Sequence, residues 1–89
     1  MAEIHGNPAV MREYARYLLQ FSEDTTQRVS LLRQRLQQIG ATEWTDDNFK
    51  QFFAEFEVAE RELVRVLARV EDELVPHLSA MAARYEALE

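Results

Sequence analysis

The chain has 89 residues, of which 16 are acidic and 10 basic, for a net charge of -6, and it has no cysteine. This length allows one domain at most, and the lack of cysteine excludes a disulfide framework or a cysteine metal site. The acidic balance argues against binding to nucleic acid, and no apolar run approaches the ~20 residues needed for membrane insertion.

A first helix is predicted over about residues 8–39. Asn7 is a good N-cap, Pro8 suits the first helical position, and Gly40 is interpreted as the C-cap. Apolar residues recur at steps of three and four, which is typical of a coiled-coil-like seam. The predicted seam contains Met11, Tyr14, Leu18, Phe21, Val29, Leu32, Leu36 and Ile39, with Thr25 as a polar interruption.

A turn over about 40–45 leads to a second helix over about 46–88. Thr45 is predicted as its N-cap, and Asp46 and Asp47 favour the positive end of the helix dipole. Pro76 predicts a kink, because its ring crowds the carbonyl of Asp72. The seam of this helix contains Phe49, Phe52, Phe56, Ala59, Leu63, Leu67, Val70, Leu74, Leu78, Met81, Tyr85 and Leu88.

The short turn makes the two helices antiparallel neighbours, so we expect an all-α, two-helix hairpin that forms one domain over 1–89. Pairing outward from the turn places Pro8 beside Pro76, so that residues 77–89 overhang the first helix. Because the first helix is near neutral and the second is strongly acidic, Arg28 is expected near Glu57 or Glu60.

A lone hairpin leaves apolar side chains beside the seam in water. We therefore expect a dimer, with itself or with a related hairpin, that completes a four-helix bundle. The side chains in question are Tyr17, Leu19, Leu31, Phe53, Val64 and Val66.

Residues suited to catalysis are few. Glu73 and His77 have a spacing that can bind metal on one helix face, but a partly exposed histidine after a kink is the favoured interpretation. No serine sits in a nucleophile elbow, and no glycine-rich loop is present for phosphate. We therefore expect no enzymatic activity, no metal and no cofactor.

Aromatic residues gather just after the turn. Phe49, Phe52 and Phe56 lie on the seam and are expected in the core. For Trp44 and Phe53 two roles stay open. One of them is expected to pack back on Leu36 and Ile39 of the first helix, and the other to belong to a partner surface, where Trp and Phe are enriched.

The turn tryptophan, the aromatic second helix and the opening Ile4–Pro8 resemble the WXG-type small helical proteins of type VII secretion. That family is named for a Trp-x-Gly in the turn, and here Asp46 occupies the glycine position after Trp44. The ending Tyr85-x-x-x-Glu89 is similar to the family's C-terminal Tyr-x-x-x-Asp/Glu, which would make it an export signal. Alternatively, Tyr85 continues the seam and Glu89 is a terminal charge.

The resemblance implies an exported substrate or helical adaptor that acts as a dimer. Its further partners would be a secretion ATPase or a larger exported toxin. It would be made in the cytoplasm and secreted without a cleaved signal peptide, because the opening MAEIHGNP lacks the basic and apolar regions of one. The alternative is a non-secreted intracellular adaptor or chaperone that binds one protein partner through its aromatic end.

Overall fold

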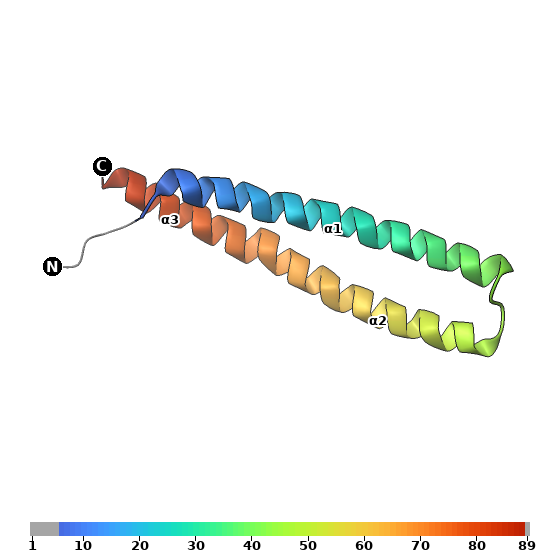
Figure 1. Ribbon diagram of the computed structural model, residues 1–89. Coiled ribbons are helices and arrows are strands. Elements are labelled where there is room, and N and C mark those ends of the chain that lie inside the picture. Colours follow the sequence, from blue (N-terminus) through green and yellow to red (C-terminus); the bar gives the residue numbers. More distant parts are fainter. Residues whose placement is uncertain (1–5, 89) are drawn as a thin grey trace.

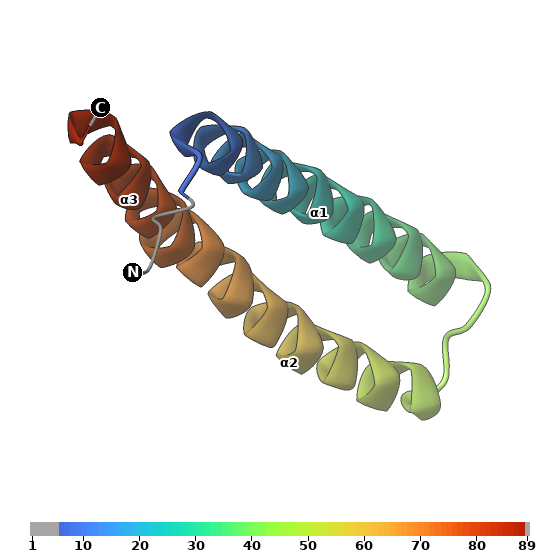
Figure 2. The same cartoon turned by 60° about the vertical axis from the view of Figure 1, so that its left-hand side comes forward.

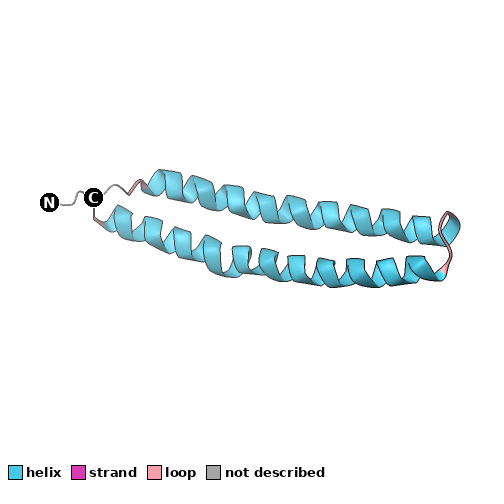
Figure 3. Cartoon of the chain, turned by 60° about the horizontal axis from the view of Figure 1, so that its bottom comes forward, coloured by secondary structure: helices cyan, strands magenta, loops and turns pink. Residues whose placement is uncertain are grey.

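The computed structural model describes residues 6–88 and forms an all-α helical hairpin (Figure 1). One arm is helix α1 (Pro8–Thr42). The other arm contains α2 (Asp47–Arg69), the π-helical segment η1 (Val70–Leu74) and α3 (Val75–Ala87). A short loop joins the arms at one end of a molecule that measures 66 × 18 × 18 Å (Figure 3).

The two arms begin at side-chain caps. As predicted, Asn7 caps α1: its Oδ1 accepts hydrogen bonds from the backbone N–H groups of Ala9 at 3.1 Å and Val10 at 3.3 Å. The prediction of Thr45 as the second cap is wrong. Asp46 holds this position, because its backbone is extended and its Oδ1 reaches the N–H groups of the next turn.

The predicted role of Gly40 as a C-cap is also wrong. Helix α1 continues to Thr42, and the Glu43 N–H donates to the Ile39 carbonyl at 2.8 Å. No glycine among residues 6–88 has a positive φ. A Cβ atom at position 40 would instead overlap the ring of Phe49, so glycine is required here for close packing across the loop.

The irregularity predicted near Pro76 takes the form of a π-helical turn. Proline lacks an N–H and collides with the carbonyl four residues earlier in an α-helix. In η1 the helix is wider, and the Val75 N–H donates to the Val70 carbonyl, five residues back. The second arm therefore continues as helix through α3 without a loop.

The overhang predicted for residues 77–89 is shorter in the part that the structure describes, because α3 begins beside α1. Arg12, near the start of α1, pairs with Glu86, near the end of α3. Most of α3 lies beside α1, and its C-terminal end projects past the start of α1 (Figures 1 and 2). The pairing moves along the chain because α1 extends beyond Gly40 and the loop is centred later than residue 42.

The contact line between the arms differs from the predicted seam. Tyr14, Phe21 and Leu32 are 56%, 57% and 61% exposed, although the prediction placed them in the core. Phe52 and Leu74 of the second arm were also predicted in the seam, and they are exposed as well. The residues that are buried are mostly small: Ala15, Ser22, Leu67, Val70 and Ala82. Small side chains let helix axes approach, which turns the larger ones onto a neighbouring face.

The arms are not equally close along their length. Figures 1 and 2 show the two ribbons close together at the start of α1 and along α3, and diverging toward the loop. Helix α1 accordingly approaches α3 far more extensively than it approaches α2. The aromatic residues lie at the diverging end.

Candidate functional site

Helix α1 carries a line of exposed apolar residues, each one position before a residue that packs against the other arm. Tyr14 and Phe21 directly precede the buried residues Ala15 and Ser22 in the sequence, and they are seven residues apart, or two helical turns. A shallow surface hollow lies along this line. It is lined by Tyr14, Tyr17, Leu18 and Phe21.

The second arm repeats the same pattern. Val66 directly precedes the buried Leu67, and Phe52 and Ala59 lie on the same side at intervals of seven residues. In α3, Met81 precedes the buried Ala82. A second hollow near the end of α3 is lined by Met81, Arg84, Tyr85 and Leu88.

These two lines lie on the same side of the hairpin. On each arm the exposed line is displaced by one residue toward the N-terminus from the contact line, so the sense of rotation is equal. Two antiparallel helices are related by an approximate twofold axis perpendicular to both. A shift toward the N-terminus therefore moves the exposed line of each helix to the same side of the pair. Equal rotation on both arms therefore gives one shared side, called the apolar face below. It consists of Tyr14, Leu18, Phe21, Leu32, Phe52, Ala59, Val66, Leu74, Met81, Tyr85 and Leu88.

The opposite side is polar. The residues that directly follow the contact line lie there, and most are charged or small: Arg16, Glu23, Arg61, Ala68 and Ala83. Six exposed large apolar residues are not members of this face: Val10, Tyr17, Leu19, Leu31, Val58 and Val64. Scattered apolar residues are normal on a surface, whereas a face that gathers exposed apolar residues from both arms indicates a binding surface.

The predicted turn residues Trp44 and Asp46 form one unit with the first turn of α2. The Trp44 indole Nε1–H donates to Asp46 Oδ1 at 2.8 Å, the same oxygen that caps α2. The Trp44 ring lies 5.5 Å from the Phe49 ring and 6.0 Å from the Phe52 ring, between centroids. Asp46 therefore fixes both the helix start and the tryptophan.

The structure places Phe52 and Phe53 on different sides of α2. Phe53, for which packing and partner binding were both left open, is half-buried on the inner side, with its ring 5.7 Å from Phe49. The Arg33 guanidinium lies over it at 5.4 Å, a cation–π contact. Phe52, predicted in the core, is exposed on the apolar face. The sequence signal that identifies it is its position directly before the inward-facing Phe53.

Arg33, rather than the predicted Arg28, links the arms near the loop. Its guanidinium donates to Glu57 at 3.1 Å and also to Glu60. These hydrogen bonds raise the pKa of Arg33. The two acidic residues were predicted correctly, and the pair fixes the relative height of the two arms at this end.

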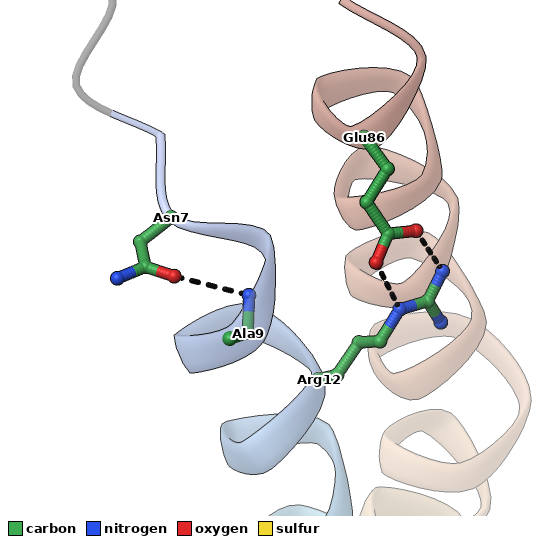
Figure 4. A network of polar contacts seen from close by, with 4 residues as sticks. All are labelled: Asn7, Ala9, Arg12 and Glu86. Carbon is green, nitrogen blue, oxygen red and sulfur yellow. Dashed lines mark hydrogen bonds and ion pairs between the residues drawn. The ribbon is translucent and has the colours of Figure 1, made fainter. Parts of the chain in front are cut away.

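A second ion pair links the arms at their other end (Figure 4). Arg12 Nε donates to Glu86 Oε2 at 3.0 Å, and Arg12 Nη2 donates to Glu86 Oε1 at 2.6 Å. This two-point contact lowers the pKa of the Glu86 carboxyl below its ordinary value and raises that of Arg12. Both side chains are partly exposed, so the pair positions the arms more than it stabilises them.

Tyr85, the first residue of the predicted export signal, lies at this same end. It is half-buried, and a Cβ atom at Gly6 would overlap its ring, so the chain just before α1 packs against it. Ile4 and Glu89, the other predicted positions of the family pattern, lie outside the described residues. Tyr85 is thus both a packed residue and a member of the apolar face.

The polar groups of residues 6–88 do not form a metal centre. No three His, Asp or Glu side chains of this part are grouped to hold a metal ion. Glu73, which has a metal-binding spacing from His77, accepts a hydrogen bond from Arg69 at 3.2 Å. What the described arrangement can do is bury its apolar face against another molecule.

Within the described residues, no helix is both long and apolar enough to cross a membrane. Comparison of the chain with protein-family models, with curated proteins and with solved structures found no match. A function for this chain therefore rests on its apolar face, its loop and its ion pairs.

Proposed function

We propose that this chain is a non-enzymatic interaction hairpin that packs its apolar face against a second helical hairpin, to complete a four-helix bundle. The one-sided apolar face is the observation that carries this proposal. Tyr14, Phe21 and Phe52 are about half exposed in the single chain. A second two-helix layer is the simplest cover for a flat, elongated apolar face of this kind.

The resemblance to WXG-type proteins adds a role to this association. We propose a secretion-associated hairpin, exported itself or acting as an adaptor for a larger exported toxin, and recognised by a secretion ATPase. The antiparallel hairpin and the position of Trp44 in the connecting loop support this role. Asp46 stands where the WXG pattern has glycine, and the three hydrogen bonds that its Oδ1 accepts give that replacement a structural use.

The apolar face can be tested with a photo-crosslinking amino acid placed at Phe21, on the face, or at Gln34, on α1 but away from it. The expected result in the source cells is one discrete product from position 21, of a mass that matches a second small helical protein. Position 34 should give none. Equal products from both positions, or none from position 21, would contradict the proposal.

Export is tested separately at the end of the chain, by immunoblotting of culture medium. Glu89→Gln should abolish export, while Tyr85→Phe, which keeps the ring against Gly6, distinguishes the hydroxyl from the packing. Circular dichroism should show that both variants remain helical. If the wild-type chain never reaches the medium, the non-secreted adaptor is the function that remains, with the exposed Phe52 in its binding surface.

A further inference from the structure

We infer that η1 is a rotational switch. Helix α3 can turn about its own axis by one residue, roughly 100°, between the observed register and a second register in which η1 is α-helical. In the observed register the fully buried Ala82 faces α1, and in the second register Met81 does. This inference goes beyond the proposed function, because it describes how the chain changes its own apolar face. Two lines of residues that follow Val70 carry it.

The contact line of the second arm takes one unusual step, and that step lies in η1. Before η1 the line runs through Leu63, Leu67 and Val70, at α-helical intervals of four and three residues. The next inward residue is Val75, five residues after Val70, and it lines a hollow shared with α1. A π-helical turn holds one residue more than an α-helical turn, so η1 absorbs the extra residue and Ala82 stays in the contact line.

A second apolar line follows Val70 at α-helical spacing. Leu74, Met81 and Leu88 lie four, eleven and eighteen residues after Val70, the intervals at which residues share one face of an α-helix. In the structure Leu74 is 49% exposed and Leu88 is 71% exposed. Leu74 and Met81 would face α1 if η1 were α-helical, because the two lines differ by one residue. The chain therefore has two sets of residues available to α1 after Val70, one small and one large.

Two features favour the observed register. Proline at position 76 lacks an N–H and collides with the carbonyl of Asp72 in a regular α-helix, so Pro76 favours the π-helical turn. The small residues Ala15 and Ala82, which are 5% and 0% exposed, let the helices approach closely. Both contributions are lost when α3 turns, since η1 then becomes α-helical and Met81 takes the place of Ala82.

Two other features favour the second register. The Ser22 hydroxyl is fully buried and has no hydrogen-bond partner within residues 6–88, which destabilises the closely packed state. Leu74 is half exposed in the single chain, and turning α3 would bury it against α1. The larger side chains would also hold the helices further apart, so that water reaches Ser22. Opposing contributions of this kind give two states of similar free energy.

The two registers present different apolar faces. In the observed register Leu74 and Met81 belong to the apolar face together with Tyr14 and Phe21 of α1. In the second register these two side chains turn toward α1, and the face loses its part on α3. A partner that packs on the apolar face therefore binds the observed register more tightly and stabilises it. Rotation of α3 couples partner binding to the packing of the hairpin.

The chain has no cysteine, so pairs of introduced thiols report the register of α3. Ala15→Cys is combined in turn with Ala82→Cys, Met81→Cys or Ala83→Cys. A cysteine at position 82 faces α1 in the observed register, and one at position 81 faces it in the second. Position 83 is the matched control, because turning α3 moves it further from α1. Mass spectrometry of the dilute, purified chain in a glutathione buffer measures the intramolecular disulfide of each pair.

The switch should respond in opposite directions to two substitutions. Pro76→Ala should raise the 15–81 disulfide at least ~10-fold relative to the 15–82 disulfide, because the main obstacle to an α-helical η1 is removed. The 15–83 disulfide should not rise. Ser22→Ala in the chain that keeps Pro76 should lower the 15–81 disulfide, because it removes the buried hydroxyl that destabilises the observed register. Circular dichroism should show that each variant remains helical.

A deletion separates rotation of α3 from loosening of this end. Removing Glu71 from the Pro76→Ala variant places Ala82 eleven residues after Val70, where a straight α-helix directs it toward α1. The 15–82 disulfide should then return to its level in the chain that keeps Pro76, although η1 is now α-helical. An end that had only loosened would gain nothing from the loss of a residue.

Three results would overturn the inference. They are a ratio of the 15–81 to the 15–82 disulfide that Pro76→Ala leaves unchanged, an equal rise at positions 81 and 83, and no recovery when Glu71 is removed. None of them bears on the proposed function, because the measurement uses the chain without a partner. Absence of a crosslinked product from position 21 would instead remove the proposed function and leave the rotation of α3 intact.

Discussion

The two ends of the hairpin are built from different side chains. At the end formed by the start of α1 and by α3, the contact residues Ala15, Ser22 and Ala82 are small and nearly inaccessible. At the loop end the residues between the arms are Phe49 and Phe53, with Arg33 over the latter. The arms are close at the first end and diverge at the second (Figure 1).

This difference shows how side-chain size sets the spacing of two helices. Small residues let the axes approach, and large rings hold them apart. Close approach has its own cost: the hydroxyl of Ser22 is buried and has no hydrogen-bond partner within residues 6–88. The close end therefore holds the chain together, while the diverging end leaves Phe52 and Trp44 accessible to a partner.

The largest effect is expected from filling the close end. Ala82→Leu places a large side chain where the wild-type residue is fully buried. Overpacking of this kind destabilises by about 1–3 kcal/mol, because the helices have to separate. Urea denaturation followed by circular dichroism, at one fixed protein concentration, measures the change.

The matched control for this variant is Ala83→Leu, one residue along and exposed. It makes the same chemical change outside the contact line and should alter the unfolding free energy little. If the two variants unfold alike, the close end is not the main source of stability, and the contrast between the two ends fails.

A smaller effect is expected at the loop end from Asp46→Ala. This change removes the cap of α2 and the acceptor of the Trp44 indole, and loss of a cap costs about 1 kcal/mol. Asp46→Asn keeps an acceptor oxygen and should retain most of that stability. Denaturation with Trp44 fluorescence measures both variants, and a full loss in Asp46→Asn would show that the charge, rather than the cap, is needed.

The fold was predictable from the sequence because its signals are local. Asn7 and Pro8 start a helix, long stretches without proline continue it, and a short connection makes the arms antiparallel. The prediction ended α1 too early, before Gly40, because a glycine can mark either a helix end or a close contact. Only the position of the Phe49 ring distinguishes the two.

The candidate site was harder to predict, because two apolar lines lie side by side on each arm. Tyr14 and Phe21 are larger than Ala15 and Ser22, so size favoured them for the core. The sequence does not state which line faces the other arm. That choice depends on how closely the helices approach, which is a property of the packed pair.

The smallest effect concerns the ion pair that closes the first end. The hydrogen bonds from Arg12 lower the pKa of Glu86 from its ordinary value of 4.5. A carboxyl with a lowered folded-state pKa stabilises the fold above its ordinary pKa, and this contribution is lost as the pH falls through the lowered value. Glu86→Gln should therefore be less stable than wild type at pH 7, and this difference should disappear progressively below pH 4.5.

Denaturation of both proteins across this pH range measures the effect, with Glu71→Gln as a control that removes an equal charge away from Arg12. Because both partners are partly exposed, added salt should reduce the difference at neutral pH. A difference between wild type and Glu86→Gln that persists in strong acid would mean that Glu86 acts through packing rather than through its charge. The first end would then be held by its small side chains alone, which makes the contrast with the loop end sharper.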